Sequence, residues 1–304
     1  MPTMIPPHTF NDEAWARSVL ELIRRASTIL PADVMEALGS AGANAEVPRA
    51  ATILASLCRN AEIARANSTP LCQDTGTLTF WVETPYDFPR NKLRRAICHA
   101  VADATAKGYL RQNTIRPVDG SSVPDNVADG SPAIHFEESE EVEFVRISLL
   151  MKGGGCENMS TQYSLPDATI GAARDLQGVR TCVLHAVWRA QGMGCAPGIL
   201  GVCIGGDRAE GYARAKKQLL RPLTDSSPDE VLAELERRLL AEANTLEIGP
   251  MGLGGKTTLL GVKMCGATRL PASFFVTVAY SCWACRRSSM VVDVATGVEK
   301  EVQA

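Results

Sequence analysis

Apolar side chains recur at helical spacing between residues 11 and 67, with an interruption at Pro31. Asn11 and Asp12 offer an N-cap to the first segment, and Pro48 is tolerable in the first turn of a later one. The spacing predicts helices over 11–40, broken at Pro31, and over 45–66. We therefore expect an N-terminal helical part, which could form a subdomain over residues 11–67.

Beyond residue 67, short apolar runs of strand length alternate with longer amphipathic segments. The pattern predicts strands over 78–82, 142–150, 199–204, 274–280 and 290–294, and residues 259–262 are also β-like. It predicts helices over 90–107, 167–191, 208–220 and 227–244. We expect Asp167 to cap the second of these helices, and Ser227 to open a capping box at the last. The fold class predicted is α+β: a single large domain, residues 1–304, of mixed short β-sheets and helices.

Composition excludes several kinds of protein. The 304 residues are 45% hydrophobic and 21% charged, which is enough apolar material for a substantial core. The net charge is −3 with scattered basic residues, so we expect no nucleic-acid partner. No apolar run is long enough to span a bilayer, and Met1–Phe10 lacks a secretory pattern. We expect a cytoplasmic protein without a membrane partner.

The ten cysteines do not predict a disulfide framework in a reducing compartment. Cysteines among apolar helical positions, such as Cys58, are interpreted as small buried hydrophobic residues. Cys72, Cys195 and Cys282 differ, because each lies at a break flanked by glycine, proline or an aromatic residue. Ligand-binding cysteines tend to occupy such breaks.

The segment Cys72–Thr77 places a thiol two residues before the carboxylate of Asp74. Gly76 can bend the backbone there, because glycine tolerates positive φ. Taken alone, this hexapeptide favours a buried cysteine in a tight turn with a capping aspartate. The alternative is a metal ligand beside a proton donor.

Two glycine-rich segments suggest binding loops. Lys152–Asn158 contains three consecutive glycines whose N–H groups could approach an anion, although a flexible turn is the plain alternative. Gly249–Thr258 resembles a nucleotide-binding P-loop, but Pro250 stands where that motif requires glycine. We interpret it as an anion-holding loop and not as part of an ATPase.

Three thiolates can hold a [4Fe–4S] cluster at three corners and leave the fourth iron open to a ligand. An open iron is a Lewis acid, and glycine-rich loops with arginines suit a small dicarboxylate. Four segments resemble motifs of the iron–sulfur hydro-lyases, which comprise the class I fumarases and the α subunits of L-tartrate dehydratase. These segments are Cys72–Thr77, Lys152–Asn158, Gly249–Thr258 and Cys282–Ala284. The resemblance extends from the helix before Cys72 to Arg287.

The resemblance implies roles for individual residues. It makes Cys72, Cys195 and Cys282 the three ligands of a [4Fe–4S] cluster with one open iron, in preference to Cys203 and Cys285. Asp74 becomes the candidate catalytic acid or base. The implied substrate-binding residues are Gln73, Arg111, Lys152, Gly154 and Gly155. Cys156, where many members have serine, is interpreted as a bystander that could serve as an adventitious ligand.

The implied reaction is reversible hydration of a small dicarboxylate, either fumarate to malate or, in the dehydrating direction, L-tartrate to oxaloacetate. Family members often carry a histidine near the segment Thr268–Pro271, and this chain has none there. A substituted substrate such as methylfumarate is therefore an alternative. Single-chain fumarases continue into a further domain, so we expect a separate β subunit to complete the active site, in an α homodimer or an α2β2 assembly.

Two other classes of function stay open at this point. A cluster-bearing redox or sensor protein would need the cysteines but not Asp74. A structural zinc protein would use the pair Cys282 and Cys285. Thioredoxin-like exchange at that C-x-x-C pair is less favoured, because the pair lies near the end of the sequence.

Overall fold

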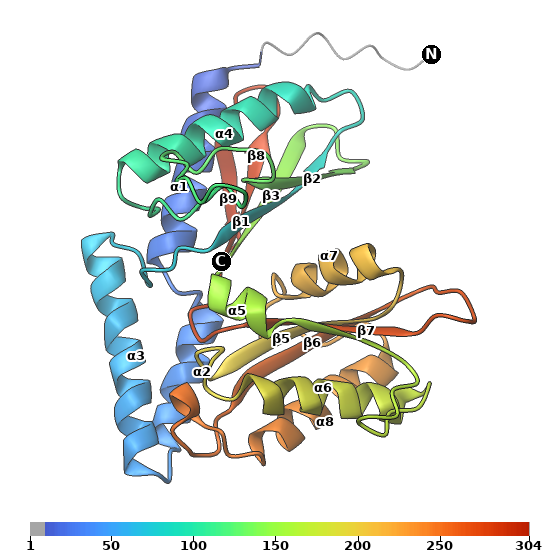
Figure 1. Ribbon diagram of the computed structural model, residues 1–304. Helices are drawn as coiled ribbons and strands as arrows, with labels where there is room; N and C mark the ends of the chain where they lie inside the picture. The colour runs from blue at the N-terminus through green and yellow to red at the C-terminus, as the bar shows by residue number, and fades with distance from the viewer. Residues whose placement is uncertain (1–9, 304) are drawn as a thin grey trace. The chain divides into compact units, whose positions relative to one another are not determined.

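The computed structural model describes residues 10–303 (Figure 1). Its backbone contacts form two compact units. The first comprises the chain up to Leu30, residues 63–151 and the chain from Arg286 onward; the second comprises residues 31–62 and 152–285. The α+β class is confirmed. The expected helical part over residues 11–67 is shared between the two units, and its role as a subdomain of one catalytic domain stays a prediction.

A five-stranded sheet with two helices forms the first unit. The strand order is β2-β1-β3-β8-β9, with β1 and β2 parallel and β8 antiparallel to both β3 and β9. The elements are α1 (Asp12–Thr28), β1 (Thr77–Thr84), α4 (Arg90–Ala106), β2 (Ala133–Glu138), β3 (Phe144–Lys152), β8 (Arg286–Asp293) and β9 (Glu299–Gln303).

The core of this unit lies between the sheet and the helices α1 and α4. Alternate strand residues such as Phe80 and Ile147 face the helices, as the two-residue period of a strand requires. The helices contribute buried side chains at three- and four-residue spacing, among them Trp15 and Ile97. Asn11 caps α1 through its side-chain oxygen, which accepts the Ala14 N–H at 3.1 Å, as the sequence predicts.

A four-stranded sheet with helices on both faces forms most of the second unit. Its order is β4-β7-β5-β6, with β5 parallel to β6 and antiparallel to β7. The elements are α2 (Ala32–Ala43), α3 (Pro48–Asn67, which continues into the first unit), α5 (Gly154–Met159), β4 (Thr161–Ser164), α6 (Leu176–Ala190), β5 (Gly198–Gly205), α7 (Arg208–Gln218), α8 (Glu230–Asn244), a 3₁₀ turn (Pro250–Gly252), β6 (Leu259–Ala267) and β7 (Phe275–Ser281).

Helix α7 covers one face of this sheet, while α6 and α8 cover the other (Figure 1). Leu200 and Val202 of β5 belong to the core on the α6 and α8 side. Gly201 lies between them and points to the opposite face, where an added Cβ would overlap the Ala215 carbonyl of α7. The absence of a side chain at Gly201 therefore lets α7 pack close to the sheet.

Two predicted helix starts are wrong. The helix expected from Asp167 begins at Leu176, because Asp175 is the residue whose carboxylate caps it, accepting the Gly178 N–H at 2.7 Å. Asp167 instead accepts the Thr169 N–H at 2.9 Å, two residues on. That bond closes a local turn, which competes with helix formation.

The capping box predicted to open at Ser227 is also misplaced. Asp229 caps α8 by accepting the N–H groups of Val231 and Leu232, and Pro228 precedes the cap instead of occupying the first helical turn. Strands β2, β4 and β9 were not predicted, because their short sequences lack a clear alternation of apolar residues. In the described part of the chain, no helix has both the length and the apolar character needed to cross a bilayer.

The polar segment 117–132 is organised around Asn126. This side chain is only 3% exposed and adopts positive φ. Its oxygen accepts the N–H groups of Asn113 and Thr114, each at 3.0 Å. Its amide donates to the Arg111 carbonyl at 2.7 Å and to the Thr105 hydroxyl at 2.9 Å. A buried amide therefore ties the loop to residues 105–114, in addition to the burial of Val123.

We expect Asn126→Ala to lower the free energy of unfolding by roughly 2–4 kcal/mol, because it leaves several buried polar groups without partners. Chemical denaturation followed by circular dichroism measures the loss. The control Asn91→Ala changes an exposed residue of α4 and should cost less than about 0.5 kcal/mol. Equal denaturation midpoints for the two variants would contradict the role of Asn126.

Candidate functional site

The segment Cys72–Thr77 forms a tight turn in the first unit. Gly76 has φ of +78°, as the sequence predicts for the bend. The Asp74 carboxylate accepts the Gly76 N–H at 3.0 Å, so it also serves as a local turn residue. Cys72 and Asp74 are half-buried, and Gln73 between them is exposed.

Thr75 fixes this turn to the segment that carries Arg111. Its side chain is 1% exposed, and its hydroxyl accepts the Arg111 N–H at 3.2 Å and the Asn113 side-chain amide at 3.0 Å. The Arg111 side chain is exposed. The structure thus brings together Asp74 and Arg111, which the sequence separates by more than thirty residues. Sequence reasoning missed Thr75, which carries no chemistry of its own.

Arg286 is a second residue that sequence reasoning missed. Its side chain is 1% exposed, and its Nη1 donates to the Asp74 carbonyl at 2.5 Å. Its buried Nε has no hydrogen-bond partner among residues 10–303. A buried guanidinium that is not compensated lowers the stability of the fold by several kcal/mol. The burial of Arg286 next to the Asp74 backbone is therefore energetically costly. Its place directly after the C-x-x-C pair was the available signal.

Three thiols gather in the second unit: Cys156 of α5, Cys195 before β5, and Cys282 after β7. Cys195 adopts φ of +54° at the end of the glycine-rich turn, and its carbonyl accepts the Trp283 N–H at 3.3 Å. The Cys156 thiol donates to the Gly194 carbonyl at 3.9 Å. Backbone and side-chain contacts therefore join all three segments.

The thiols also interact with one another. A hydrogen bond from Cys282 lowers the pKa of Cys156, and the positive charge of Lys152 adds to this effect. Burial and the charge of Cys195 oppose it. The pKa of Tyr280 is raised by burial and by the same three cysteines. Cys156, expected to be a bystander, thus lies in direct contact with a predicted ligand.

A buried ion network supports the helix that carries Cys156. The Lys152 ammonium is 2% exposed and lies 3.0 Å from Glu157 and 2.9 Å from the Ser160 hydroxyl. Lys216 of α7 binds the other Glu157 oxygen at 2.6 Å. Burial lowers the pKa of Lys152, although Glu157 counteracts it. Burial would raise the pKa of Glu157, but the two lysines lower it overall.

The remaining part of the Lys152–Asn158 segment is a short helix and not a flexible turn. Gly153 is its N-cap residue, and Gly154 and Gly155 are its first two residues. Gly155 lies near the Met193 carbonyl, 3.7 Å from where its Cβ would be. The predicted substrate contacts of Lys152, Gly154 and Gly155 stay predictions, and Lys152 already has two partners within the chain.

Tyr280 shapes the turn that presents Cys195. A Cβ built on Gly198 would lie 2.5 Å from the Tyr280 hydroxyl, and one on Gly194 would overlap the ring. On its other side, the turn meets the Gly249–Thr258 loop, where a Cβ on Gly192 would lie 2.5 Å from the Met251 carbonyl. Glycine is therefore required at three positions around Cys195 for packing reasons.

Cys285 and Cys203, the alternative candidate ligands, have partners elsewhere in the second unit. The Cys285 thiol donates to the Leu219 carbonyl at 3.9 Å, whereas Cys282 interacts with Cys156. This division disfavours a zinc site built on Cys282 and Cys285. Cys203 pairs with Cys265 across neighbouring strands. The preference for Cys195 and Cys282 that the resemblance implies stays a prediction.

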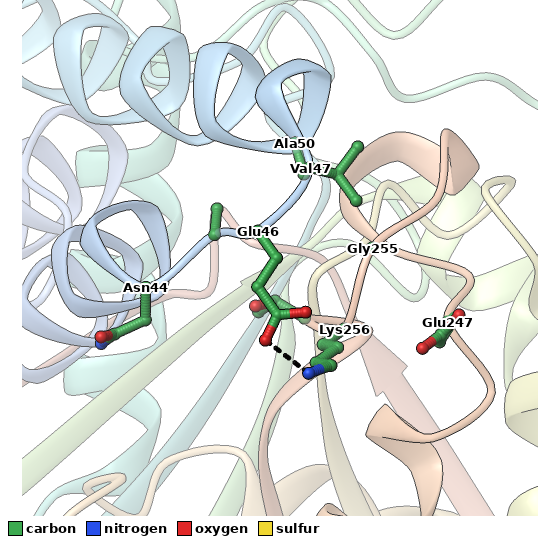
Figure 2. A pocket seen from close by; sticks show the side chains of 9 residues that line it. Asn44, Glu46, Val47, Ala50, Glu247, Gly255 and Lys256 are labelled. Carbon is green, nitrogen blue, oxygen red and sulfur yellow. Dashed lines mark hydrogen bonds and ion pairs between the residues drawn. The ribbon is translucent and has the colours of Figure 1, made fainter.

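The Gly249–Thr258 loop does not present a free cation for an anion. Lys256 lies 2.5 Å from Glu46, and Glu247 lines the same small cavity of about 80 Å³ (Figure 2). The two carboxylates outnumber the single ammonium of Lys256 there. The loop's clearer contribution is its packing against Gly192 and the bond from the Met251 N–H to the Ala196 carbonyl at 2.8 Å.

The predicted site residues thus fall into two sets. The first unit holds Cys72, Gln73, Asp74 and Arg111, and the second unit holds Lys152, Gly154, Gly155, Cys195 and Cys282. Between Phe10 and Gln303, no group of three histidine, cysteine, aspartate or glutamate residues is arranged to hold a single metal ion. A cluster makes a different demand, because each of its thiolates binds a separate iron.

Comparison with known proteins identifies the family of this chain. The family model described as fumarate hydratase (Fumerase) matches residues 16–291. The chain belongs to the fumarate hydratase family. The predicted resemblance is therefore confirmed, and the matched range contains both sets of site residues.

Three relatives illustrate the spread of this fumarate hydratase family. A protein of Geobacillus stearothermophilus named as a class I fumarate hydratase is 45% identical over 92% of this chain, and the match spans 55% of that relative's length. A protein of Methanocaldococcus jannaschii named as an L(+)-tartrate dehydratase α subunit is 33% identical, over 89% of this chain and 94% of its own. The Escherichia coli K12 L(+)-tartrate dehydratase α subunit is 30% identical, over 88% and 86%. Both printed activities are those of hydro-lyases.

We expect Gly194→Ala in this fumarate hydratase family member to lower the melting temperature, because the new methyl group must displace the Tyr280 ring. Overpacking of this kind costs roughly 1–3 kcal/mol. The control Gly266→Ala adds a methyl group on β6 where no atom lies within 4 Å. Differential scanning calorimetry compares them, and equal melting temperatures would show that Tyr280 does not constrain the turn.

Proposed function

We propose that this chain is the catalytic α-type component of a [4Fe–4S]-dependent hydro-lyase that reversibly hydrates a small dicarboxylate. The supporting observation is the meeting of Cys156, Cys195 and Cys282 at one place in the second unit of a fumarate hydratase family member. Soft thiol donors are the ligands that iron–sulfur clusters take. The printed names of the relatives supply the reaction class.

The donor set fits such a group. Cys195 is exposed and held at positive φ by glycine-dependent packing, so its sulfur projects from a rigid turn. Cys282 lies at the end of β7 and interacts with a second thiol. We propose Cys72, Cys195 and Cys282 as ligands, with Cys156 as the neighbour that hydrogen-bonds to Cys282. When bound, the cluster would supply a Lewis-acidic iron open to a substrate oxygen.

The chain's own residues would then bind the substrate and move protons. Asp74 is the candidate proton donor or acceptor, because its carboxylate lies on a turn fixed by Thr75 and Arg286. Arg111 would bind a substrate carboxylate through its exposed guanidinium, an ideal partner for that group. Gln73 and the N–H groups of Gly154 and Gly155 would orient the remaining oxygens. Fixing these groups in place lowers the entropic part of the barrier.

The relatives leave the substrate open between fumarate or malate and L-tartrate. Because the segment Thr268–Pro271 contains no histidine, a substituted diacid such as methylfumarate is a further candidate substrate. Because two relatives are named as α subunits, we propose a β-type chain as a partner and an α2β2 assembly or an α homodimer. Substrate, activity and partner are tested together by assaying the chain with and without that β-type chain.

Anaerobic reconstitution with iron and sulfide tests the cluster. We expect a brown protein with broad visible absorbance and turnover of one of the unsaturated or hydroxylated diacids. Cys195→Ser and Cys282→Ser should each lose most of the absorbance and the bound iron, because each removes one ligand. Cys285→Ser is the matched control and should retain both. A colourless wild-type protein, or a loss confined to Cys285→Ser, would refute the proposal.

Asp74→Asn separates a hydro-lyase from a cluster-bearing sensor. The substitution keeps the size of the side chain and an oxygen for the Gly76 N–H, but it removes the ionisable group. We expect kcat to fall by about 10²–10⁴-fold, the range for a general acid or base, while cluster absorbance persists. Asp87→Asn, at an exposed position before α4, should leave kcat unchanged. An unchanged rate in Asp74→Asn would exclude proton transfer by this residue.

A further inference from the structure

A second pair of cysteines lies in the sheet of the second unit. Cys203 of β5 and Cys265 of β6 are direct partners in the register of these two parallel strands. Register partners point to the same face of a sheet, so the two thiols lie side by side. Their interaction raises the pKa of Cys203 and lowers the pKa of Cys265.

The spacing of this pair suits a disulfide. Neighbouring strands are separated by about 4.8 Å, and a disulfide joins residues whose Cα atoms are roughly 4.4–6.8 Å apart. The pair lies on the face covered by α7, because Gly201, two residues before Cys203, meets Ala215 of that helix (Figure 1). Bridging would need the two side chains to rotate and would not need the strands to move apart.

The two thiols have unequal access and unequal charge environments. Cys265 is half-buried, whereas Cys203 is fully buried. The hydrogen bond from Cys203 lowers the pKa of Cys265, and the guanidinium groups of Arg214 and Arg221 lower it further against the cost of burial. The same hydrogen bond, together with burial, raises the pKa of Cys203. The accessible sulfur is thus the one favoured as thiolate, which is the reactive form.

Two other half-buried cysteines lack these features. Burial raises the pKa of Cys58 and of Cys98, and the carboxylate of Glu62 adds to the rise at Cys58. They have exposure of the same class as Cys265. They therefore serve as internal comparisons within one protein, since they differ from Cys265 chiefly in charge environment and in the lack of a paired thiol partner in the strand register.

We propose that Cys203 and Cys265 form a peroxide-responsive dithiol site, in which Cys265 reacts first and Cys203 closes a reversible disulfide. The Cys265 sulfur attacks one oxygen of hydrogen peroxide, the O–O bond breaks, and the released hydroxide takes a proton to become water. The sulfur is thereby oxidised to a sulfenic acid. The Cys203 sulfur then gives up its proton and attacks that sulfur, the S–O bond breaks, and a second water leaves.

The balance is two thiols and one peroxide giving one disulfide and two waters. An external dithiol reverses the change by exchange through a mixed disulfide. Nothing in this chemistry depends on an iron–sulfur cluster or on a dicarboxylate. The inference therefore stands or falls separately from the proposed hydro-lyase activity.

Peptide mapping after mild oxidation tests the site in the full-length protein. The protein is treated with a small excess of hydrogen peroxide, quenched, alkylated and digested, and each cysteine is quantified by mass spectrometry. We expect Cys265 to be oxidised about tenfold or more faster than Cys58 and Cys98, following the larger thiolate fraction. The product should be a linked Cys203–Cys265 peptide that dithiothreitol removes.

Variants assign the order of events. Cys203→Ser should stop the reaction at a Cys265 sulfenic acid that dimedone traps, and Cys265→Ser should leave Cys203 unoxidised. Cys58→Ser is the control and should form the linked peptide as the wild type does. Because a variant in the sheet could fail to fold, the wild-type rates decide independently. Oxidation of Cys265 no faster than Cys58, or a disulfide to any other cysteine, would overturn the proposal.

Discussion

The arrangement of Cys156, Cys195 and Cys282 depends on the packing of the Tyr280 ring against two glycines, Gly194 and Gly198. The ring fills the volume that side chains at Gly194 and Gly198 would need, so the turn carrying Cys195 is pressed against β7. The same strand leads into Cys282, and the Trp283 N–H binds the Cys195 carbonyl. One aromatic side chain therefore packs against the turn that carries Cys195 and lies on the strand that leads to Cys282. Close-packed interiors transmit such a constraint, because small displacements are already costly.

Buried charge is the second organising feature, and the buried cations of the two units differ in how many partners they have. In the second unit, the Lys152 ammonium is compensated by Glu157 and Ser160, and Lys216 completes the network. Within the second unit, this arrangement ties Lys152 to α5 and α7, and so positions Cys156. In the first unit, the Arg286 guanidinium has one carbonyl partner at Asp74 and an Nε without a partner among the described residues. The hydrogen bond from this buried cation to the Asp74 carbonyl fixes the backbone that carries the candidate catalytic carboxylate.

The sheet of the second unit carries cysteines in two kinds of backbone setting. Cys195 and Cys282 lie where β5 begins and β7 ends, in loops whose conformation glycine permits. Cys203 and Cys265 lie within regular strands, where register alone brings them together. Loop thiols suit a ligand that must be approached from outside, whereas strand thiols suit a bond between neighbours. The ten cysteines are therefore not a uniform set, and their backbone context separates their roles better than their number does.

The sequence by itself determined the elements with strong periodicity, the bend at Gly76, the break at Pro31 and the family. These depend on local preferences and on motif residues, which a linear pattern carries. It misplaced the start of α6, because Asp167 and Asp175 are both good caps and only the surrounding chain selects between them. Only the tertiary structure decided that Cys156 contacts Cys282, that Cys285 turns to Leu219, and that Arg286 lies behind Asp74. Such contacts join residues distant in sequence, and their energy depends on burial and packing that no local pattern records.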